Sequence, residues 1–406
     1  MSQSYNKNIL LWPQVRLGDV AHVIMGQSPA SSAYNSSKRG LPLIQGNNDI
    51  KKRKTVSRVW TSEITKIVEA GDIVLTVRAP VGLVGIAIEK VCIGRGVCGI
   101  QTKNASKDFI FKFLEYFEPK WGSLEQGSTF TAVNSSDIRK LRLFLPPLVE
   151  QNRIVSVLET WDKVIEKLTQ KIELKKQVKK GLMQNLLSGK MRLDGFTQDW
   201  ILVSLVDVGK CLRGVNYKPE EDLLDKDTPK SFRLLRSTNV QKGKVVIHDI
   251  QIVVGERVKK EQVLRIGDIL ICMANGSKNL VGKSSKFSLV DSYQYTFGSF
   301  MGVFRVSKIE DNDFINFLFE TNRYRYYISN LLSGSSINNL KSSDIEGMRF
   351  KIPSDKKERD AIVNILITSD KEIELLEKKL QQIKQQKKYL LNNLITGAIR
   401  TPENLQ

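Results

Sequence analysis

The sequence predicts an α+β protein built as a pseudo-twofold tandem repeat, with two globular units joined by two long helices that pack as an antiparallel coiled coil. Three observations lead to this fold class. The stretch "GLMQNLLSGKMRL" at 181–193 returns as "YLLNNLITGAIRT" at 389–401. Apolar residues in both copies follow the seven-residue pattern of helices that pack against a partner. The segments before each copy contain short β-rich runs separated by turn residues.

The repeat has a fixed offset in its helical parts and a drifting offset elsewhere. Gly189 aligns with Gly397 and Arg192 with Arg400, and the whole stretch 152–193 returns as 360–401. The preceding segments match more loosely, as in "GSTFTAVNSSDIRKLRLFLP" and "GSSINNLKSSDIEGMRFKIP". Insertions and deletions concentrate in loops, so we expect two globular units that share a framework and differ in their loops.

The globular units are expected to be rich in short strands. The runs are separated by turns with Gly, Asn, Asp and Pro; they include "DIVLTVRAP", "GLVGIAIE" and "LRLFLP" in the first unit, and "KVVIHDIQIVV" and "FMGVFRV" in the second. Helices are predicted at 107–121 and 311–332, where aromatic residues at helical spacing indicate core packing rather than base stacking. The repeated "SSD" at 135–137 and 342–344 predicts a helix start with Ser or Asp as the cap.

Each repeated stretch is predicted to be a long helix that follows a proline and ends near a glycine. In the second stretch, Asp355 is the expected N-cap and Glu358 the expected capping-box glutamate. The economical partner for each helix is the other copy, running antiparallel, although a coiled coil with a second chain is the alternative. The predicted seam positions are Leu158, Trp161, Ile165, Leu168 and Ile172 in the first helix, and Leu366, Ile373, Leu376, Leu380 and Ile383 in the second.

Composition limits the class of protein. The chain has 406 residues, 41% of them hydrophobic, but no apolar run of the roughly 18–20 residues that a membrane span needs. The first residues have no basic segment followed by a long apolar one, so no signal peptide is expected and the predicted location is cytoplasmic. The four cysteines show no CxxC spacing, which favours buried free thiols, and with two histidines no metal site is expected.

The strong positive charge is the first indication of function. Lys and Arg number 63 against 43 Asp and Glu, a formal net charge of +20. Such an excess favours a polyanionic partner, most often nucleic acid, over a generally basic protein. No phosphate-binding loop, GxGxxG, GxSxG or HExxH motif is present, so the sequence indicates a binding protein without catalytic residues or a bound cofactor.

Exposed loops with Arg, Lys, Asn, Ser and Thr are the expected place for base and phosphate contacts. They include "SSKRG", "QGNNDIKKRK" and "GSTFTAVN" in the first unit, and "RLLRSTNVQKGK", "ANGSKN" and "GSSINNLK" in the second. The candidate DNA-binding residues are Lys38, Arg39, Asn47, Asn48, Lys51, Lys52, Arg53, Lys54, Arg78, Ser128 and Thr129 in the first unit, and Arg236, Thr238, Asn239, Lys242, Lys244, Asn275, Lys278, Ser335, Asn338 and Lys341 in the second.

The plan and several motifs resemble the specificity subunit of type I restriction-modification systems, over essentially the whole chain. The most specific marks are the helix ends "LMQNLLSGKMRL" and "LLNNLITGAIR", followed by "LPPLVEQNRIVSVL" at 145–158 and "GDIVLTVRAPVGLVGIA" at 71–87. The second half departs from this pattern, because "IPSDKKERDAIVNIL" lacks the double proline and the pair Glu150–Gln151.

The resemblance implies a domain order and a division of labour. Residues 1–150 and 194–354 would be target-recognition domains, 151–193 and 355–401 helical spacers, and 402–406 a tail. Each recognition domain would read one half of a bipartite, asymmetric double-stranded DNA target, and the helices would set the spacing.

The resemblance also implies partners that perform the chemistry. Two modification subunits would bind S-adenosylmethionine and methylate adenine, and restriction subunits would use ATP and Mg²⁺. Two alternatives remain at this point: a coiled-coil scaffold whose globular ends bind proteins, and the specificity chain of a type IIG-like fused nuclease-methyltransferase.

Overall fold

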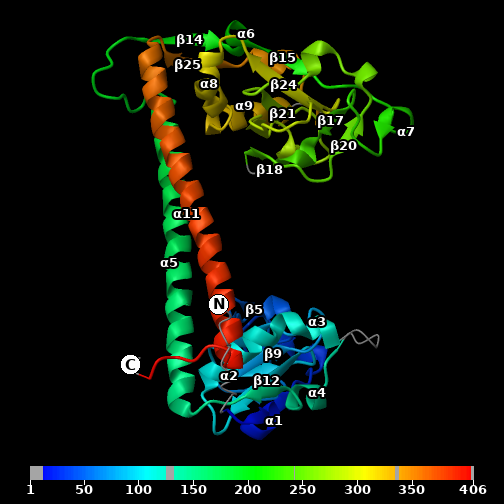
Figure 1. The fold of residues 1–406 in the computed structure, drawn as a ribbon, viewed down its shortest axis with the longest axis vertical. Helices are drawn as coiled ribbons and strands as arrows, with labels where there is room; N and C mark the ends of the chain where they lie inside the picture. Colours follow the sequence, from blue (N-terminus) through cyan, green and yellow to red (C-terminus); the bar gives the residue numbers. More distant parts are fainter. Residues whose placement is uncertain (1–11, 125–131, 242, 334–337, 404–406) are drawn as a thin grey trace, which may run out of the picture. The chain divides into compact units, whose positions relative to one another are not determined.

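The computed structural model describes residues 12–124, 132–241, 243–333 and 338–403 of the chain, which divides into two compact units (Figure 1). Unit 1 comprises Met1–Gln170 together with Glu377–Gln406, and unit 2 comprises Lys171–Leu376. Each unit therefore contains a globular part and one portion of each long helix.

The two long helices are α5 (Leu148–Leu186) and α11 (Lys356–Thr396), which are green and orange-red in Figure 1. In unit 1, Leu158 of α5 lies in one buried cluster with Leu394, near the end of α11. In unit 2, Leu186 near the end of α5 lies in one cluster with Leu366, near the start of α11. The helices therefore pack antiparallel, which confirms the prediction.

Ion pairs on both sides of the unit boundary follow the same antiparallel register. In unit 1, Lys387 Nζ lies 2.6 Å from Asp162 Oδ1, and in unit 2, Lys175 Nζ lies 2.8 Å from Glu372 Oε1. All ten predicted seam residues are buried or half-buried. By contrast, Leu375 is 66% exposed. The seven-residue pattern thus identified the packed faces of both helices.

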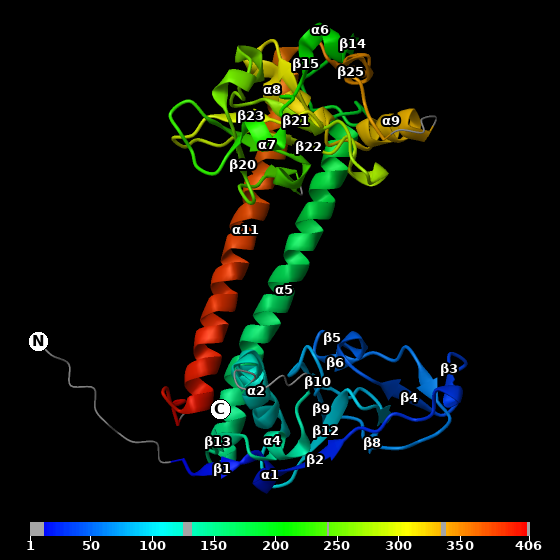
Figure 2. The same cartoon turned by 90° about the vertical axis from the view of Figure 1, so that its right-hand side faces the viewer.

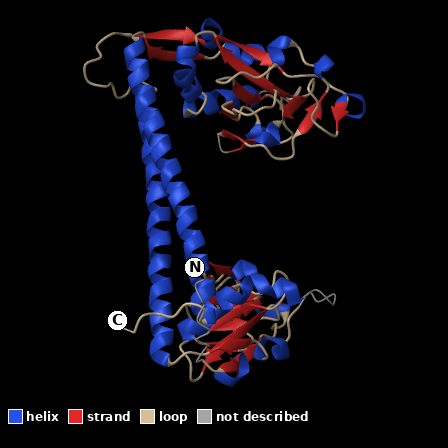
Figure 3. Ribbon diagram, in the orientation of Figure 1, coloured by secondary structure: helices blue, strands red, loops and turns tan. Residues whose placement is uncertain are grey.

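The globular part of unit 1 contains two main sheets (Figure 3). The six-stranded sheet has the order β2 (Ala21–Met25), β12 (Val97–Thr102), β9 (Ile73–Thr76), β10 (Val84–Ile86), β6 (Lys54–Thr55) and β5 (Ile50–Lys51). The five-stranded sheet has the order β3 (Tyr34–Asn35), β7 (Trp60–Thr61), β4 (Leu41–Ile44), β11 (Val91–Ile93) and β8 (Ile67–Val68). A separate pair joins β1 (Gln14–Arg16) to β13 (Arg142–Phe144), so segments from both ends of residues 12–144 meet.

Unit 2 repeats this framework with different loops. One four-stranded sheet has the order β15 (Gly209–Arg213), β24 (Met301–Val306), β21 (Ile269–Cys272) and β22 (Ser284–Lys286). The other has the order β16 (Leu223–Leu224), β20 (Gln251–Val253), β17 (Phe232–Leu235) and β23 (Tyr295–Phe297). Two pairs complete it: β14 (Trp200–Ser204) with β25 (Arg349–Pro353), and β18 (Val240–Gln241) with β19 (Lys244–Val245).

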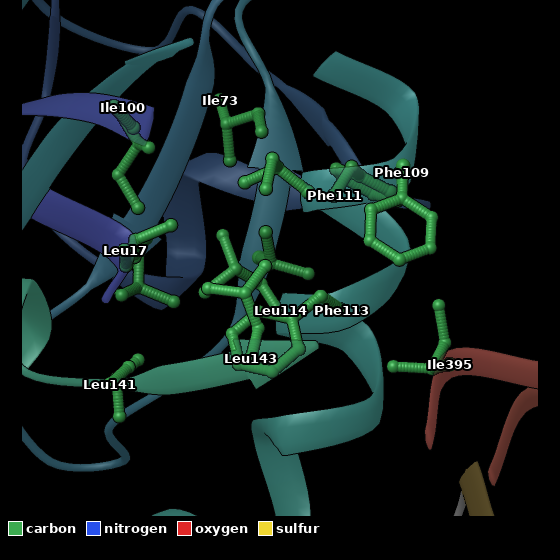
Figure 4. Close-up of a cluster of buried hydrophobic side chains, with 14 of the residues drawn as sticks. Leu17, Ile73, Ile100, Phe109, Phe111, Phe113, Leu114, Leu141, Leu143 and Ile395 are labelled. Atoms are coloured by element: carbon green, nitrogen blue, oxygen red, sulfur yellow. The ribbon is translucent and has the colours of Figure 1, made fainter. Parts of the chain in front are cut away.

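The core of unit 1 lies between the sheet and α2 (Lys107–Phe117). Figure 4 shows Phe109 and Leu114 of this helix in one cluster with Ile73 of β9 and Ile395 of α11. These four side chains are at most 2% exposed. Burying each such side chain stabilises the fold by about 1.5–3 kcal/mol. The aromatic spacing at 107–121 was therefore a core signal, as predicted.

Both predicted mid-unit helices are shorter than expected. The segment 311–332 forms two helices, α8 (Asn312–Leu318) and α9 (Asn322–Ser333), because the buried Thr321 hydroxyl accepts a hydrogen bond from the Tyr324 N–H and starts the second. In unit 1, Pro119 follows α2, and the chain continues as a 3₁₀ turn η3 (Glu118–Lys120) and α3 (Trp121–Leu124).

The repeated "SSD" segments begin helices, as predicted: α4 (Ser135–Arg139) and α10 (Ser342–Glu346). The cap itself differs from the prediction. The Asn134 side chain accepts hydrogen bonds from the first turn of α4, and the Asp137 carboxylate accepts one from the Asn134 N–H. The serines are therefore inside the helices rather than at the caps.

Short helices complete the two units: α1 (Leu17–Val20), α6 (Leu205–Val208) and α7 (Pro219–Asp222). The four cysteines are buried free thiols, as predicted. Burial raises the pKa of the Cys98 and Cys211 thiols to about 12. Over the described residues, every helix is too short or too polar to serve as a membrane span.

Candidate nucleic-acid interface

Three predicted loops of unit 2 come together in the folded chain. They are the 3₁₀ turn η4 (Ser237–Asn239) after β17, the loop after β21, and the segment before α10. Asn275 Nδ2 donates to Ser237 Oγ at 3.3 Å, and the Asn275 N–H donates to the Asn338 carbonyl at 3.3 Å. Asn338 Nδ2 donates to the Gly276 carbonyl at 3.3 Å. Segments about 40 and 100 residues apart in sequence thus form one surface, which we call the unit 2 loop surface.

The unit 2 loop surface presents cationic and polar side chains. Thr238, Lys278 and Lys341 are exposed on its three segments, and Lys244 is exposed on the neighbouring strand β19. Lys278 begins the 3₁₀ turn η7 (Lys278–Leu280). Exposed ammonium groups at fixed loop positions can meet phosphates, and the threonine hydroxyl can donate to or accept from a base edge.

Two other predicted residues shape this surface from within. Asn239 is 0% exposed, and its side-chain amide donates to the carbonyls of Val246 and His248 at 3.2 and 2.8 Å. Its Oδ1 accepts the Arg236 N–H at 2.9 Å. The Arg236 guanidinium pairs with Asp249 at 3.0 Å. The Asn239 side chain therefore stabilises the loop through these hydrogen bonds and does not reach the surface.

Unit 1 has a 3₁₀ turn at the corresponding place, η2 (Asn47–Asp49). Asp49, 5% exposed, accepts the N–H groups of Gln45 and Gly46 at 2.8 and 3.2 Å and pairs with Arg58 Nε at 2.8 Å. Asn48 is exposed beside it, and Asn47 is half-buried. Asp49 was not among the residues predicted from the sequence. It precedes the apolar strand residue Ile50, just as Asn239 precedes Val240.

The most basic segment of unit 1 is the tight hairpin of β5 and β6. Its two turn residues, Lys52 and Arg53, have φ values of 48° and 64°, a left-handed conformation that favours Gly or Asn. Lys51 pairs directly with Lys54 across the strands, which places two like charges opposite each other. Lys51, Lys52 and Lys54 are exposed. An anionic partner would reduce the electrostatic repulsion between these lysines.

Arg53 has a different environment from the three lysines around it. Its Nη1 lies 2.6 Å from Glu118 Oε2 and donates to the Val84 carbonyl at 3.3 Å. Arg53 therefore fastens the hairpin to the 3₁₀ turn η3. The positions that remain available to an outside phosphate are the lysines.

Three further predicted residues of unit 1 lie on exposed loops. The Lys38 ammonium lies 5.7 Å from the Trp60 ring centroid. The backbone N–H of Arg39 donates to Asn35 Oδ1 at 3.0 Å. Arg78 is exposed and forms an isolated backbone bridge with Ala132, as Ala274 does with Asn339 in unit 2. The equivalent bridges show that the two units build their loop regions on the same framework.

Four predicted residues, Ser128, Thr129, Lys242 and Ser335, lie outside the described residues.

Each globular part is fastened to the helix ends by a Trp–Glu–Arg cluster that the sequence did not predict. In unit 1, Glu150 accepts from Trp12 Nε1 at 3.2 Å, and Arg400 donates to both its carboxylate oxygens at 2.5 Å. In unit 2, Glu358 accepts from Trp200 Nε1 at 3.3 Å.

The arginine of the unit 2 cluster comes from the segment that follows the other long helix. Arg192, after the end of α5, donates to both oxygens of Glu358 at 2.6 and 2.8 Å. Glu358 is thus not a capping-box residue, because its carboxylate is 1% exposed and committed to this cluster. The second half of the chain does have a counterpart of Glu150, in register with the repeat.

Ionic clusters beside α2 and α8 differ between the two units. In unit 1, Lys112 and Lys387 surround Glu115 and Asp162, at distances of 2.6–3.2 Å. Burial alone would raise the pKa of Glu115, but the two ammonium groups outweigh it and hold that pKa below its ordinary value.

Unit 2 has one fewer cation at the equivalent place. Lys179 lies 3.5 Å from Glu320 and 2.7 Å from Asp370, and Phe317 occupies the position that Lys112 has in unit 1. Burial, together with the Asp370 charge, raises the pKa of Glu320 above its ordinary value despite Lys179. Within the described residues, no group of three or more His, Cys, Asp or Glu side chains could hold a metal ion.

Both halves of the chain are similar to known proteins. Residues 10–176 and 198–385 match the family model described as the type I restriction modification DNA specificity domain. A putative type I restriction enzyme MjaX specificity subunit from Methanocaldococcus jannaschii is 39% identical over 186 residues, which cover 45% of this chain and 44% of that protein. The EcoKI specificity subunit of Escherichia coli K12 is 32% identical over 205 residues, 50% of this chain and 43% of that protein.

A third relative aligns over nearly its whole length. The MjaVIII specificity subunit of the same archaeon is 25% identical over 411 residues, 96% of this chain and 93% of that protein. The alignments with the first two relatives, by contrast, span less than half of those proteins.

Solved structures support the same fold. The S subunit of the type I restriction-modification system of M. genitalium has a TM-score of 0.56 at 15% identity, over 97% of this chain and 98% of that one. A chain from a structural study of complex assembly and conformational transition in the type I system has a TM-score of 0.62 at 18% identity, over 96% and 98%. At these identities the likeness shows the fold alone.

Proposed function

Because the chain belongs to the type I restriction-modification DNA specificity family, by two matches that together cover most of its length, we propose that it is the sequence-specific DNA-binding subunit of such a complex. The family's role is recognition of DNA, and catalysis belongs to partner subunits. Each globular unit would read one half of a bipartite target in the major groove.

The observation that carries this proposal is the convergence of three separate loops in unit 2. Asn275 joins η4 to the segment before α10 by two hydrogen bonds. Lysines project from this surface, and they would position the protein on phosphates while neighbouring polar groups meet base edges. The net charge of +20 would supply affinity for DNA of any sequence.

The target is proposed to be asymmetric because the corresponding loops carry different side chains. In the hairpin of β5 and β6, Lys51 and Arg53 occupy the places that Gln241 and Gly243 have in the hairpin of β18 and β19, and Arg78 after β9 occupies the place of Ala274 after β21. Different side chains on equivalent frameworks would select different bases in the two half-sites.

The proposed partners follow from the family. Two modification subunits with S-adenosylmethionine would methylate adenine, and restriction subunits with ATP and Mg²⁺ would translocate and cleave DNA. The helices and the adjoining faces of the units would be their docking surface.

The proposal is tested by the methylome of the host before and after deletion of this gene. We expect a split, methylated-adenine motif that disappears in the deletion strain and returns when the gene is restored. A methylome with no bipartite motif that depends on this gene contradicts the proposal and favours a protein-binding scaffold.

A loop exchange tests the division between the units. Replacing residues 36–54 with the same loop of a relative is expected to change one half of the motif and leave the other unchanged. The matched control exchanges residues 233–244, which should change only the opposite half. A change in both halves from either exchange contradicts the assignment of one half-site to each unit.

A further inference from the structure

Unit 2 contains a cavity of about 330 Å³ beside the end of α5. Its wall combines the last turn of α5 and the residues after it, the start of α9, and the strand β25; these elements come together in the upper right of Figure 2. The lining residues are Gln184, Leu187, Ser188, Lys190, Thr321, Asn322, Arg323, Phe350 and Lys351.

The lining has a strong positive charge. Lys190, Arg323 and Lys351 come from three different elements, and no carboxylate is among the lining residues. Within the described part of the chain, none of these three cations forms a salt bridge, whereas Lys175 and Lys179 of α5 do. All three residues are exposed, so they place positive charge at the cavity where an anion from solution can reach it.

The lining also has an apolar part. Leu187 and Phe350 are buried, and the Arg323 guanidinium lies 5.6 Å from the Phe350 ring centroid. The helix α9, 12 residues long, begins in the wall at Asn322. The Thr321 hydroxyl already accepts the Tyr324 N–H in this first turn, so the cations are the main donors that the cavity offers.

The repeat shows that these cations are not needed for the shared fold. Lys190 aligns with Ala398, Arg323 with Glu118, and Lys351 with Phe144. Unit 1 thus builds the same framework with no cation at any of the three positions. The charge of the cavity is an addition specific to unit 2.

We propose that this cavity of unit 2 is a phosphate-binding site. Three cations exceed what a single carboxylate would neutralise, and they match a phosphate dianion with its several acceptor oxygens. None of the lining residues belongs to the unit 2 loop surface, so the site is separate from base reading. The phosphate can come from the DNA backbone or from a free phosphate compound, and the experiment separates these sources.

The test uses the full chain and two triple variants of equal charge change. The first, Lys190→Ala with Arg323→Gln and Lys351→Ala, removes the cations of the cavity. The control, Lys180→Ala with Lys308→Ala and Lys357→Ala, removes three exposed lysines of unit 2 outside the cavity. Circular dichroism melting curves check that both variants fold.

Calorimetric titration with inorganic phosphate and with pyrophosphate measures the free-phosphate source. We expect the Kd of the cavity variant to be about tenfold higher or more, because the variant lacks the charged donors that would bind the phosphate oxygens. The control variant is expected to stay within about twofold of the parent.

Binding of a random-sequence DNA duplex at several salt concentrations measures the backbone source. If the DNA backbone supplies the phosphate, the cavity variant loses about one unit of slope in log K against log salt for each phosphate contact, beyond any loss in the control. Equal behaviour of the two variants with free phosphate, pyrophosphate and DNA overturns the proposal. Binding of polyglutamate at the cavity without binding of any phosphate probe also overturns it, in favour of an acidic protein segment.

Discussion

Glu358 is buried against an arginine and a tryptophan, and its loss should be costly. A carboxylate 1% exposed accepts from Arg192 and Trp200, so its removal leaves a charged group and an indole N–H without their acceptor. We expect Glu358→Ala to lower the free energy of unfolding by about 2–4 kcal/mol, measured by urea denaturation. The control Glu256→Ala, at an exposed residue of the same unit, should change it by less than about 0.5 kcal/mol.

Glu115 and Glu320 occupy equivalent positions but should respond oppositely to substitution. The pKa of Glu115 is depressed, so its contribution to stability is present above the ordinary value of 4.5 and is lost as pH falls through the folded pKa. The pKa of Glu320 is raised, so its contribution is present below 4.5 and is lost as pH rises through the folded pKa.

At pH 7 we therefore expect Glu115→Gln to destabilise the protein, by about 1–3 kcal/mol, because Lys112 and Lys387 would share one carboxylate. Glu320→Gln should leave stability unchanged or raise it, because Lys179 keeps its pair with Asp370. Urea denaturation of both variants from about pH 4 to pH 8 measures this difference. Destabilisation of equal size by the two substitutions would contradict the proposed asymmetry.

At the scale of single residues, the sequence predicted which side chains are exposed better than it predicted which side chains contact each other. It placed lysines such as Lys51 and Lys278 at exposed positions, because charge alone keeps them in water. It could not separate Asn239 from its neighbours, since burial of that amide depends on carbonyls seven and nine residues further on. The ion pairs of Arg53 with Glu118 and of Glu358 with Arg192 could not be predicted for the same reason, because the partners are remote in sequence.

At the scale of elements, the helical seam offers a matched test on α11. Leu366 is fully buried and Leu375 is 66% exposed, and both lie in unit 2. We expect Leu366→Ala to cost about 2–5 kcal/mol, through lost burial and a residual cavity. Leu375→Ala should stay within about 0.5 kcal/mol of the parent in the same urea denaturation. Equal losses would mean that the seam is assigned to the wrong face.

The long helices were predictable because periodicity, a preceding proline and a terminal glycine agree over some 40 residues. The break between α8 and α9 was not, since the aromatic spacing runs through it while a buried hydroxyl at Thr321 starts a new helix. Helix caps and interruptions depend on single hydrogen bonds. A pattern of apolar residues carries no information about them.

At the scale of the whole molecule, the proposed role of the helices as a spacer leads to a deletion experiment. Residues 167–173 and 375–381 are equivalent in the repeat, and by the register of the Lys175–Glu372 pair they also face each other. Removing both heptads shortens each helix by about 10.5 Å. We expect the methylated motif to keep both halves while its spacer shortens by about three base pairs.

The control for this deletion removes only one of the two heptads, which offsets the seam and should lower the melting temperature. A changed half-site in the double deletion, with folding retained, would contradict the division of labour between units and helices.

The composition of unit 1 from two distant parts of the chain has a consequence for synthesis. Its core includes Leu391, Leu394 and Ile395 together with residues near the N-terminus such as Leu17. A ribosome that has made the first 170 residues has therefore not yet supplied the side chains that close this core. Unit 2 is continuous, so it can fold while translation proceeds, and unit 1 is finished last. Nascent chains that stop before the second helix ends would expose the apolar face of α2 and become substrates for chaperones and proteases.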